Sequence, residues 1–278
     1  MSVRIVTDST CDLPSNVIEE YGIRVIPLHI HVGLDDYLDG IDMSREVFYK
    51  NLPSFREQPT TAVPSTHKFR AIYNSLADEG ADEVLSIHIS QSLSAIVNVA
   101  QTAANETTNI PVTVFDSQQL SLGTGFAVLK AAELAHAGYS VNEILPVLED
   151  QIKRTHVWAA LDTLEFLKRS GRMNRVISTI GEFLQLKPIL KMYAGTSGVE
   201  RVRTQKKAIE RLREMLIKYS PFERIAFLHS GAVEQANYLK SEISQLIPNS
   251  ETWLEVINPV LGAHIGPGVV GFACITKE

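Results

Sequence analysis

The first half of the chain alternates short apolar runs with polar turns and helical segments. VRIVT at 3–7, EVLSIHIS at 83–90 and VTVFDS at 112–117 are rich in Val and Ile, which is typical of buried strands. IRVIPLHIHVG at 23–33 alternates apolar and polar positions and predicts one further strand. Helical segments separate these runs. The pattern therefore predicts an α/β fold whose first sheet is mainly parallel, with helices on both faces.

A helix start signal follows the first strand, in DSTCDLPSNVIEEYG. Asp12 or Ser15 can cap a helix here, Pro14 suits its first turn and Gly22 its end. In parallel sheets of this kind, ligands bind at the carboxyl ends of the strands. The polar residues after each strand are therefore the first candidates for a site.

The second half of the chain is less regular. Helical patterns at 141–155 and 204–220 flank shorter strand candidates. These candidates are HVWAAL, KPILKMY, RIAFLHS and TWLEVINPV. They predict a mixed sheet with helices. We expect two domains, an N-terminal α/β domain at 1–155 and a C-terminal α/β domain at 156–278.

Composition excludes several classes of protein. With 26 Lys and Arg against 32 Asp and Glu, the net charge is −6, the wrong sign for a protein that binds nucleic acid through phosphates. No run is long and apolar enough for a transmembrane segment, and the N-terminus does not resemble a secretion signal. The two cysteines, Cys11 and Cys274, are too few for a disulfide framework. We expect a reduced, cytoplasmic protein.

The glycine-rich segment GPGVVG at 266–271 satisfies the letters of a dinucleotide-binding turn but not its context. Such a turn must lie between a strand and a helix, and only seven residues follow Gly271. Pro267 also removes a backbone N–H that the motif would offer to a pyrophosphate. The sequence has no P-loop for binding ATP, and GTSGV at 195–199 falls short of a nucleophile elbow. We interpret the segment as a turn that leaves a ligand role open to His264.

Two other groups of residues could bind a ligand. His29 and His31 lie on one face of a strand, yet no third metal ligand follows at a diagnostic spacing, so we interpret them as half-buried histidines near a sheet edge. The second group is a set of polar loop residues: Asp8, Ser9, Thr10, Thr60, Thr61, Ser65, Ser90, Ser92 and Ser94. Each alone suits a cap or a turn, but together, at the ends of strands, they could bind an anion or a carboxyl group.

Eight blocks occur in an order that resembles the DegV family. They are TDSTCDLP, TTAVPS, SQSLSA, FDS, LEFLKRSGRM, KPIL, RVRT and GAHIGPGVVG, and they span nearly the whole chain. The resemblance implies a two-domain protein without a cofactor or metal that binds a long-chain fatty acid. The carboxylate of the fatty acid would lie near the domain junction, and its acyl tail would lie in the C-terminal domain. It also implies a lipid-binding protein that is not itself an enzyme. In some bacteria such a protein is the acyl-binding subunit of a fatty acid kinase, and a separate kinase subunit makes the acyl phosphate.

The resemblance also implies residue roles. Thr61, Ser94 and His264 match family positions that contact the carboxylate, and Arg172 matches an arginine associated with the kinase partner. Arg172 belongs to a basic run that also includes Lys168, Arg169 and Arg175. This chain departs from the family pattern in three places, which are Ala62 for Ser, Ala95-Ile96 for Gly-Thr, and Ser170 for Gly.

Two other functions remain open from the residues. One is a self-sufficient hydrolase that uses a serine together with His264. The other is a binding module for a small polar anion, held by the loop hydroxyls alone.

Overall fold

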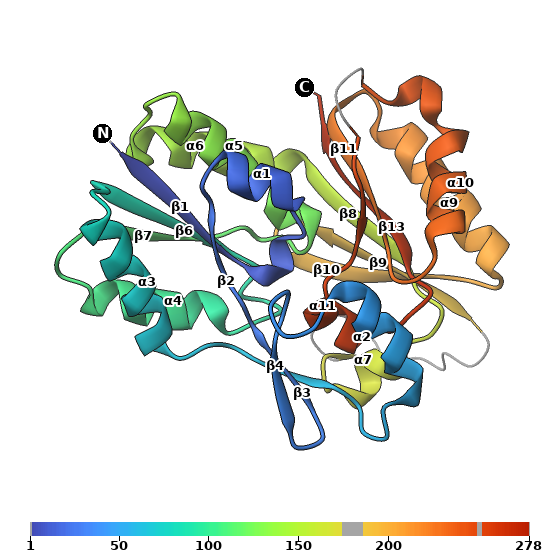
Figure 1. Ribbon diagram of the computed structural model, residues 1–278. Coiled ribbons are helices and arrows are strands. Elements are labelled where there is room, and N and C mark those ends of the chain that lie inside the picture. The colour runs from blue at the N-terminus through green and yellow to red at the C-terminus, as the bar shows by residue number, and fades with distance from the viewer. Residues whose placement is uncertain (1, 174–185, 249–251, 278) are drawn as a thin grey trace.

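The first sheet is four-stranded and parallel, in the order β2-β1-β6-β7. The computed structural model describes residues 2–173, 186–248 and 252–277 (Figure 1). The strands of this sheet are β1 (Val3–Asp8), β2 (Arg24–Ile26), β6 (Glu83–His88) and β7 (Val112–Asp116). Because all four strands are parallel, their carboxyl ends and the loops that follow meet at one edge.

Helices cover both faces of this sheet, as expected from the sequence (Figure 1). The helices of this part are α1 (Ser15–Glu20), α3 (Thr66–Asp78), α4 (Ile96–Glu106), α5 (Leu122–His136) and α6 (Val141–Arg154). The α3–α4 pair packs on one face and the α5–α6 pair on the other (Figure 1). The apolar strands are therefore buried on both sides, which explains their continuous Val and Ile runs.

The segment at 23–33 forms two strands in different sheets, so the prediction of one strand is wrong. β2 ends at Ile26, and β3 (His29–Val32) joins an antiparallel sheet of order β4-β3-β5 with β4 (Asp35–Leu38) and β5 (Thr60–Ala62). Pro27 lies between β2 and β3 and has no N–H for a ladder hydrogen bond. β3 is the central strand of its sheet, so the expectation that its histidines lie near an edge is also wrong.

A helical segment connects β4 to β5 within the small sheet. It comprises α2 (Arg45–Asn51) and the short 3-10 helix η2 (Leu52–Ser54). The Ser44 hydroxyl caps α2 by accepting a hydrogen bond from Val47 N at 3.3 Å.

The second large sheet is six-stranded and mixed, in the order β10-β9-β8-β13-β11-β12. Its strands are β8 (Thr155–Ala160), β9 (Lys187–Tyr193), β10 (Thr196–Val202), β11 (Phe222–His229), β12 (Leu254–Val256) and β13 (Val270–Thr276). The helices α9 (Gln205–Tyr219) and α10 (Val233–Glu242) pack on its outer face (Figure 1). The 3-10 helix η3 (Ser244–Leu246) follows α10.

β8 separates two hydrophobic cores by the alternation of its side chains. Val157 belongs to the core shared with the first sheet, while Trp158 and Ala160 belong to the core under α9 and α10. This alternation follows from the period of two along a strand. The inner face of the six-stranded sheet thus faces the first half of the molecule. The first sheet ends at Asp116 and the second begins at Thr155, but the domain boundary at 155 stays a prediction.

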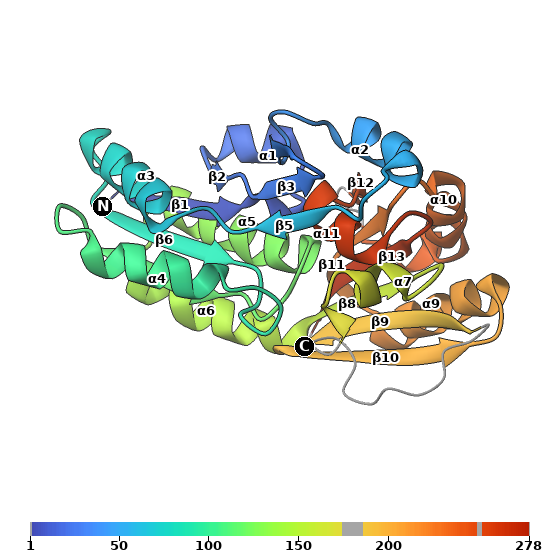
Figure 2. The same ribbon diagram turned by 90° about the horizontal axis from the view of Figure 1, so that it is seen from below.

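Two local expectations are corrected near the chain ends. Neither Asp12 nor Ser15 caps α1, because its N-cap is Pro14 and no side chain makes a capping hydrogen bond. The segment at 266–271 is a turn only in part: 266–269 link α11 (Pro259–Ile265) to β13, and Val270 and Gly271 already lie in that strand. A short 3-10 helix, η1 (Ser9–Cys11), follows β1, and α7 (Glu165–Arg169) lies beside α11 (Figure 2).

Candidate functional site

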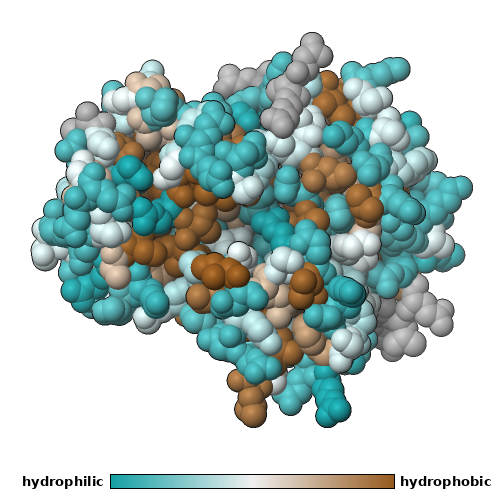
Figure 3. Space-filling view, in the orientation of Figure 1, coloured by the Kyte–Doolittle hydropathy of each residue, from teal (hydrophilic) through white to brown (hydrophobic). Residues whose placement is uncertain are grey.

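A cavity lies between the inner face of the six-stranded sheet and the carboxyl edge of the first sheet. Its walls are mostly apolar and come from β8, β9 and α11, together with the loops after β6 and β7. The apolar lining includes Leu28, Val63, Ile89, Leu93, Leu120, Val157, Ala159, Leu161, Leu167, Leu190, Met192, Leu228, Ile257, Val260, Leu261 and Ile265. In Figure 3, hydrophobic residues gather toward the middle of the visible face, while hydrophilic residues cover most of its periphery.

All four residues singled out by the sequence line this cavity. Thr61, Ser94, Arg172 and His264 come from β5, the loop before α4, the segment after α7, and α11. Thr61 and His264 are 203 positions apart, yet Thr61 Oγ1 lies 2.9 Å from His264 Nε2. The tertiary structure therefore places all four residues on one cavity and brings Thr61 into contact with His264.

His264 lies in the last turn of α11, where two features hold it. Asn258 caps the helix, its side chain accepting a hydrogen bond from Leu261 N at 2.9 Å, and Pro259 fills the first turn. At the other end, Gly266 has φ +77°, and a Cβ at this position would come within 2.4 Å of the Phe166 ring. Only glycine fits both requirements, so the helix ends directly after the histidine.

The electrostatics of His264 favour a neutral imidazole. Burial lowers the pKa of His264 to about 4, and the nearby positive charge of Arg172 acts in the same direction. Its Nδ1 atom is buried and has no hydrogen-bond partner among the described residues. A buried polar atom of this kind needs a partner, which a ligand in the cavity could supply.

Ser94 lies at the start of α4. Its hydroxyl oxygen accepts a hydrogen bond from Ile96 N at 3.3 Å, and α4 has no side-chain cap at Ala95. Ala95 also lines the cavity, so the N-terminal end of this helix faces it. The unpaired N–H groups and the dipole of a helix N-terminus attract negative charge. An anionic group near Ser94 would therefore be stabilised by more than the hydroxyl alone.

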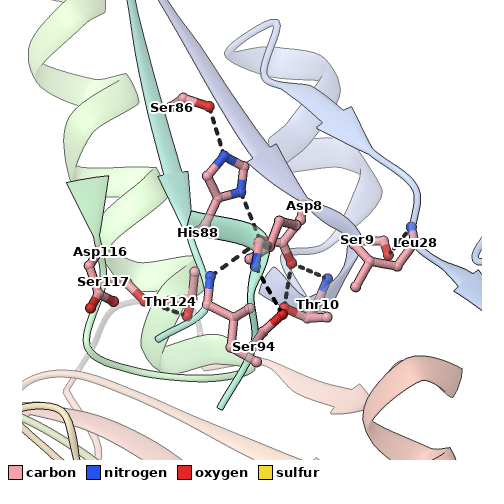
Figure 4. Close-up of polar contacts among 12 residues, drawn as sticks. Asp8, Ser9, Thr10, Leu28, Ser86, His88, Ser94, Asp116, Ser117 and Thr124 are labelled. Carbon is pink, nitrogen blue, oxygen red and sulfur yellow. Dashed lines mark hydrogen bonds and ion pairs between the residues drawn. The ribbon is translucent and has the colours of Figure 1, made fainter. Parts of the chain in front are cut away.

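A buried hydrogen-bond network around Asp8 holds the start of the loop that leads to Ser94. Asp8 Oδ2 accepts hydrogen bonds from Ile89 N at 3.2 Å and from the His88 ring, whose Nδ1 is 2.9 Å away. Asp8 Oδ1 accepts hydrogen bonds from both the backbone and the hydroxyl of Thr10, at 3.1 and 2.5 Å. Figure 4 shows His88 between Ser86 and Asp8. Although burial opposes it, His88 holds the pKa of Asp8 below its usual value.

Arg172 follows a tight turn at Gly171, which has φ +70°. Its Nη1 donates a hydrogen bond to Ser170 O at 2.9 Å. The sequence associates this arginine with a partner protein, and the structure adds that it lines the cavity and acts on His264. Of the rest of its basic run, Arg169 pairs with Glu165, and Arg175 lies outside the described residues.

The set of loop hydroxyls divides into two groups. Thr10, Thr61 and Ser94 line the cavity, whereas others serve local structure. Ser9, for example, accepts a hydrogen bond from Leu28 N at 3.2 Å. Sequence reasoning missed Ser121, which lines the cavity with the unusual φ of +52°. A positive φ at a serine is a property of the folded backbone, and the residue pattern carries no signal of it.

The structure bears on the other functions considered from the sequence. A hydrolase of this kind needs a serine hydroxyl hydrogen-bonded to the histidine. The hydroxyl that contacts the His264 ring belongs to Thr61, and Ser94 instead accepts a hydrogen bond from Ile96 N. These contacts therefore do not support the hydrolase hypothesis. For a metal site at His29 and His31, Asp36 is the nearby carboxylate: its oxygens lie 2.9 Å from His29 Nδ1 and 3.2 Å from His31 Nδ1. Across the described ranges, however, no group of three such side chains has the arrangement to hold a metal ion. In the same ranges, no helix is long and apolar enough to cross a membrane.

Comparison with known proteins gives matches that span nearly the whole chain. The model of the family described as "Uncharacterised protein, DegV family" matches residues 2–277. A DegV domain-containing protein of Streptomyces coelicolor is 34% identical over 274 residues, covering 97% of this chain and 96% of the relative. Two solved structures cover 100% of this chain and are themselves covered in full. One is that of a fatty-acid-binding DegV family protein from Thermus thermophilus, with 35% identity and a TM-score of 0.89. The other is DegV, a fatty acid binding protein from Bacillus subtilis, with 34% identity and a TM-score of 0.90. The chain belongs to the DegV family.

Proposed function

We propose that this protein binds a long-chain fatty acid, with its carboxylate at Thr61, Ser94 and His264 and its tail along the apolar walls. The observation that carries this proposal is the Thr61–His264 hydrogen bond in a mostly apolar cavity, and we refer to Thr61, Ser94 and His264 as its polar end. The fatty acid binding of the Thermus thermophilus and Bacillus subtilis relatives supports it.

The tail accounts for the affinity in this proposal. Burying about fifteen methylenes at roughly 0.8 kcal/mol each gives an upper limit near ~12 kcal/mol before association costs are subtracted. A tail of this kind matches walls built from Leu, Val, Ile and Ala side chains. The hydrophobic effect is non-directional, so these walls need shape and apolar character rather than particular polar contacts.

The carboxylate needs hydrogen bonds, because an unpaired buried charge is costly. The neutral His264 ring has one nitrogen that donates and one that accepts. If the Thr61 hydroxyl donates to Nε2, the proton lies on Nδ1, the atom without a partner, and is available for a carboxylate oxygen. Ser94 and the start of α4 supply further donors. One oxygen then remains free to react.

The test is to identify what the protein carries when it is purified. We expect native mass spectrometry to show added mass, and extraction after denaturation to release about one equivalent of a long-chain fatty acid, because an apolar cavity rarely stays empty in a cell. A lipid-free extract together with no uptake of added palmitic acid would refute the proposal. Turnover of acyl esters that Ser94→Ala abolishes would favour a hydrolase, and a bound small polar anion would favour the anion-binding module.

We further propose that the protein presents the carboxylate to a separate kinase subunit, with Arg172 at the contact. The lack of a P-loop in the sequence supports a role that leaves ATP to another chain. The position of Arg172 at the cavity supports a role close to the reacting carboxylate. A desolvated arginine at the centre of an interface is expected to contribute strongly to binding of a partner.

The Arg172→Ala variant separates a partner role from a pocket role. We expect palmitic acid binding within error of the wild type, but at least about tenfold less acyl phosphate with a cognate kinase subunit. Equal losses of lipid affinity and partner-dependent phosphorylation would assign Arg172 to the pocket instead.

A further inference from the structure

Asp12 lies four positions after Asp8, directly beyond the short helix η1, and is equally buried, with 0% exposure. Burial of a carboxylate is tolerated only where hydrogen bonds and charges replace water. Asp12 could not serve its predicted role as a helix cap because its oxygens have other partners. These partners come from three elements that are distant in the sequence.

The first partner is Asn258, the N-cap of α11. Asp12 Oδ1 accepts hydrogen bonds from Asn258 N at 2.9 Å and from Asn258 Nδ2 at 3.0 Å. The Asn258 side-chain oxygen accepts in turn from Leu261 N. Both donors of the cap residue therefore point to one carboxylate, and the first turn of α11 is oriented by it.

The other partners close a cluster around the same carboxylate. Asp12 Oδ2 accepts a hydrogen bond from the Ser121 hydroxyl at 2.5 Å, and Arg45 Nη1 lies 3.2 Å from Oδ1. Arg45 also donates a hydrogen bond to Val256 O, two residues before Asn258. The segment that enters α11 is thus held from the first sheet, from α2 and from the start of α5.

His264 lies in the last turn of this same helix, which spans only seven residues from Pro259 to Ile265. A helix this short moves as one body, because its internal hydrogen bonds link every turn to the next. A displacement of its N-terminal end would therefore move the His264 ring relative to Thr61. Hydrogen-bonding groups of a site need placement within about 0.5 Å to act together.

We propose that Asp12 is a positioning residue for His264: its carboxylate fixes the N-terminus of α11 so that the ring at the other end meets Thr61 and the ligand carboxylate. This inference rests on the proposed function. It assigns Asp12 no contact with the ligand, so Asp12 acts only through the helix.

The experiment compares two ligands with the same tail, palmitic acid and 1-hexadecanol. The ratio of their affinities isolates the recognition of the carboxylate from the burial of the tail. We expect Asp12→Asn to lower the acid-to-alcohol affinity ratio about tenfold, a loss comparable to that of one hydrogen bond to a charged group, while affinity for the alcohol stays within about twofold. General loosening of the fold would weaken both ligands alike.

A second variant covers the case in which Asp12→Asn does not fold. Asn258→Ser keeps a side-chain oxygen that can cap α11 but lacks the side-chain Nδ2 that donates to Asp12. We expect it to lower the ratio in the same direction. The matched control is Thr155→Val, which removes a buried hydroxyl that donates to Gln151 O at 2.8 Å and should leave the ratio unchanged.

The outcomes separate the inference from the function on which it rests. If the wild type binds neither ligand, the proposed function is wrong and the inference falls with it. If the wild type prefers the acid and the folded variants keep its ratio, or lose both ligands equally, only the role of Asp12 is overturned.

Discussion

The apolar walls of the cavity and its polar end are built in different ways. The walls combine apolar side chains from many elements: strands such as β8, where Val157 and Ala159 face the cavity, together with α11 and several loops. The polar end comes from Thr61, Ser94 and His264, which lie on a short strand, a loop and a helix end. The walls need only apolar surface, which many elements can supply, whereas the polar end needs particular atoms of three segments to meet.

This difference predicts different responses to mutation. Apolar burial scales with area and has no preferred direction, so the walls should tolerate any change that keeps their volume. Hydrogen bonds weaken steeply with distance and angle, so the polar end should respond to small displacements or to the loss of single atoms.

Filling the cavity from its wall should have the largest effect. Ala159→Phe places a ring in the space of the tail, and the loss of burial of about four methylenes at ~0.8 kcal/mol each corresponds to roughly 100-fold weaker binding of palmitic acid. Titration with acids of decreasing length should show the loss shrinking as the tail shortens. If this variant binds palmitic acid as tightly as the wild type does, the tail does not lie against Ala159.

The second effect is a decrease in the free energy of unfolding as the pH falls, caused by protonation of His264. Its pKa is lowered to about 4 in the folded protein, mainly by burial, against an ordinary value of about 6.5 in the unfolded chain. Between these values the unfolded state binds more protons. The contribution is therefore fully present above pH 6.5 and is lost as the pH falls through 4, by at most about 3 kcal/mol.

The measurement is urea unfolding of the lipid-free protein at several pH values. His264→Gln should lose less stability than the wild type between pH 6.5 and 4. Burial also lowers the pKa of His156 to about 4, but this ring is present in both proteins and cancels in the comparison. Parallel curves for the two proteins would contradict the assignment.

Removing one hydroxyl from the polar end should have a smaller effect. Ser94→Ala leaves the carboxylate short of a donor, and Thr61→Val removes the hydroxyl that keeps the His264 proton on Nδ1; each costs about 1 to 3 kcal/mol of binding free energy with the fold intact. Calorimetry with palmitic acid would measure it, and 1-hexadecanol serves as the control ligand. If both variants bind the acid as well as the wild type does, the carboxylate lies at another position.

A volume-conserving change in the wall should have the smallest effect. Leu190→Met keeps an apolar side chain of similar size against the cavity, and we expect palmitic acid affinity within about threefold of the wild type. The same titration as for Ala159→Phe measures it. A loss as large as that of Thr61→Val would show that the walls require specific contacts, and the contrast between the two regions would fail.

The sequence alone predicted most of the regular structure. The runs at 83–90 and 112–117 became β6 and β7, and the helical pattern at 204–220 became α9. Periodicity is a local property, so a pattern of two or 3.6 residues can be identified without knowledge of the rest of the fold. The break at Pro27 was missed because apolar and polar residues keep alternating across it.

The residues of the candidate site were available from the sequence only as separate motifs. The order of the family blocks pointed to Thr61, Ser94, Arg172 and His264, and all four line one cavity. Ser121 and the role of Asp12 were not predicted. A serine after a strand and an aspartate before a helix are usually explained as turn or cap residues. Only their contacts in the folded protein show that they have other roles.

The sequence therefore predicted most of the strands and helices, the family and the residues that could recognise a carboxylate. Tertiary structure decided which of them meet. It joined Thr61 to His264 across 203 positions and turned Asp12 from a predicted cap of α1 toward the cap of α11. The reason is physical. Secondary structure follows from neighbours along the chain, whereas a buried polar atom takes its partner from whatever the fold places within about 3 Å of it.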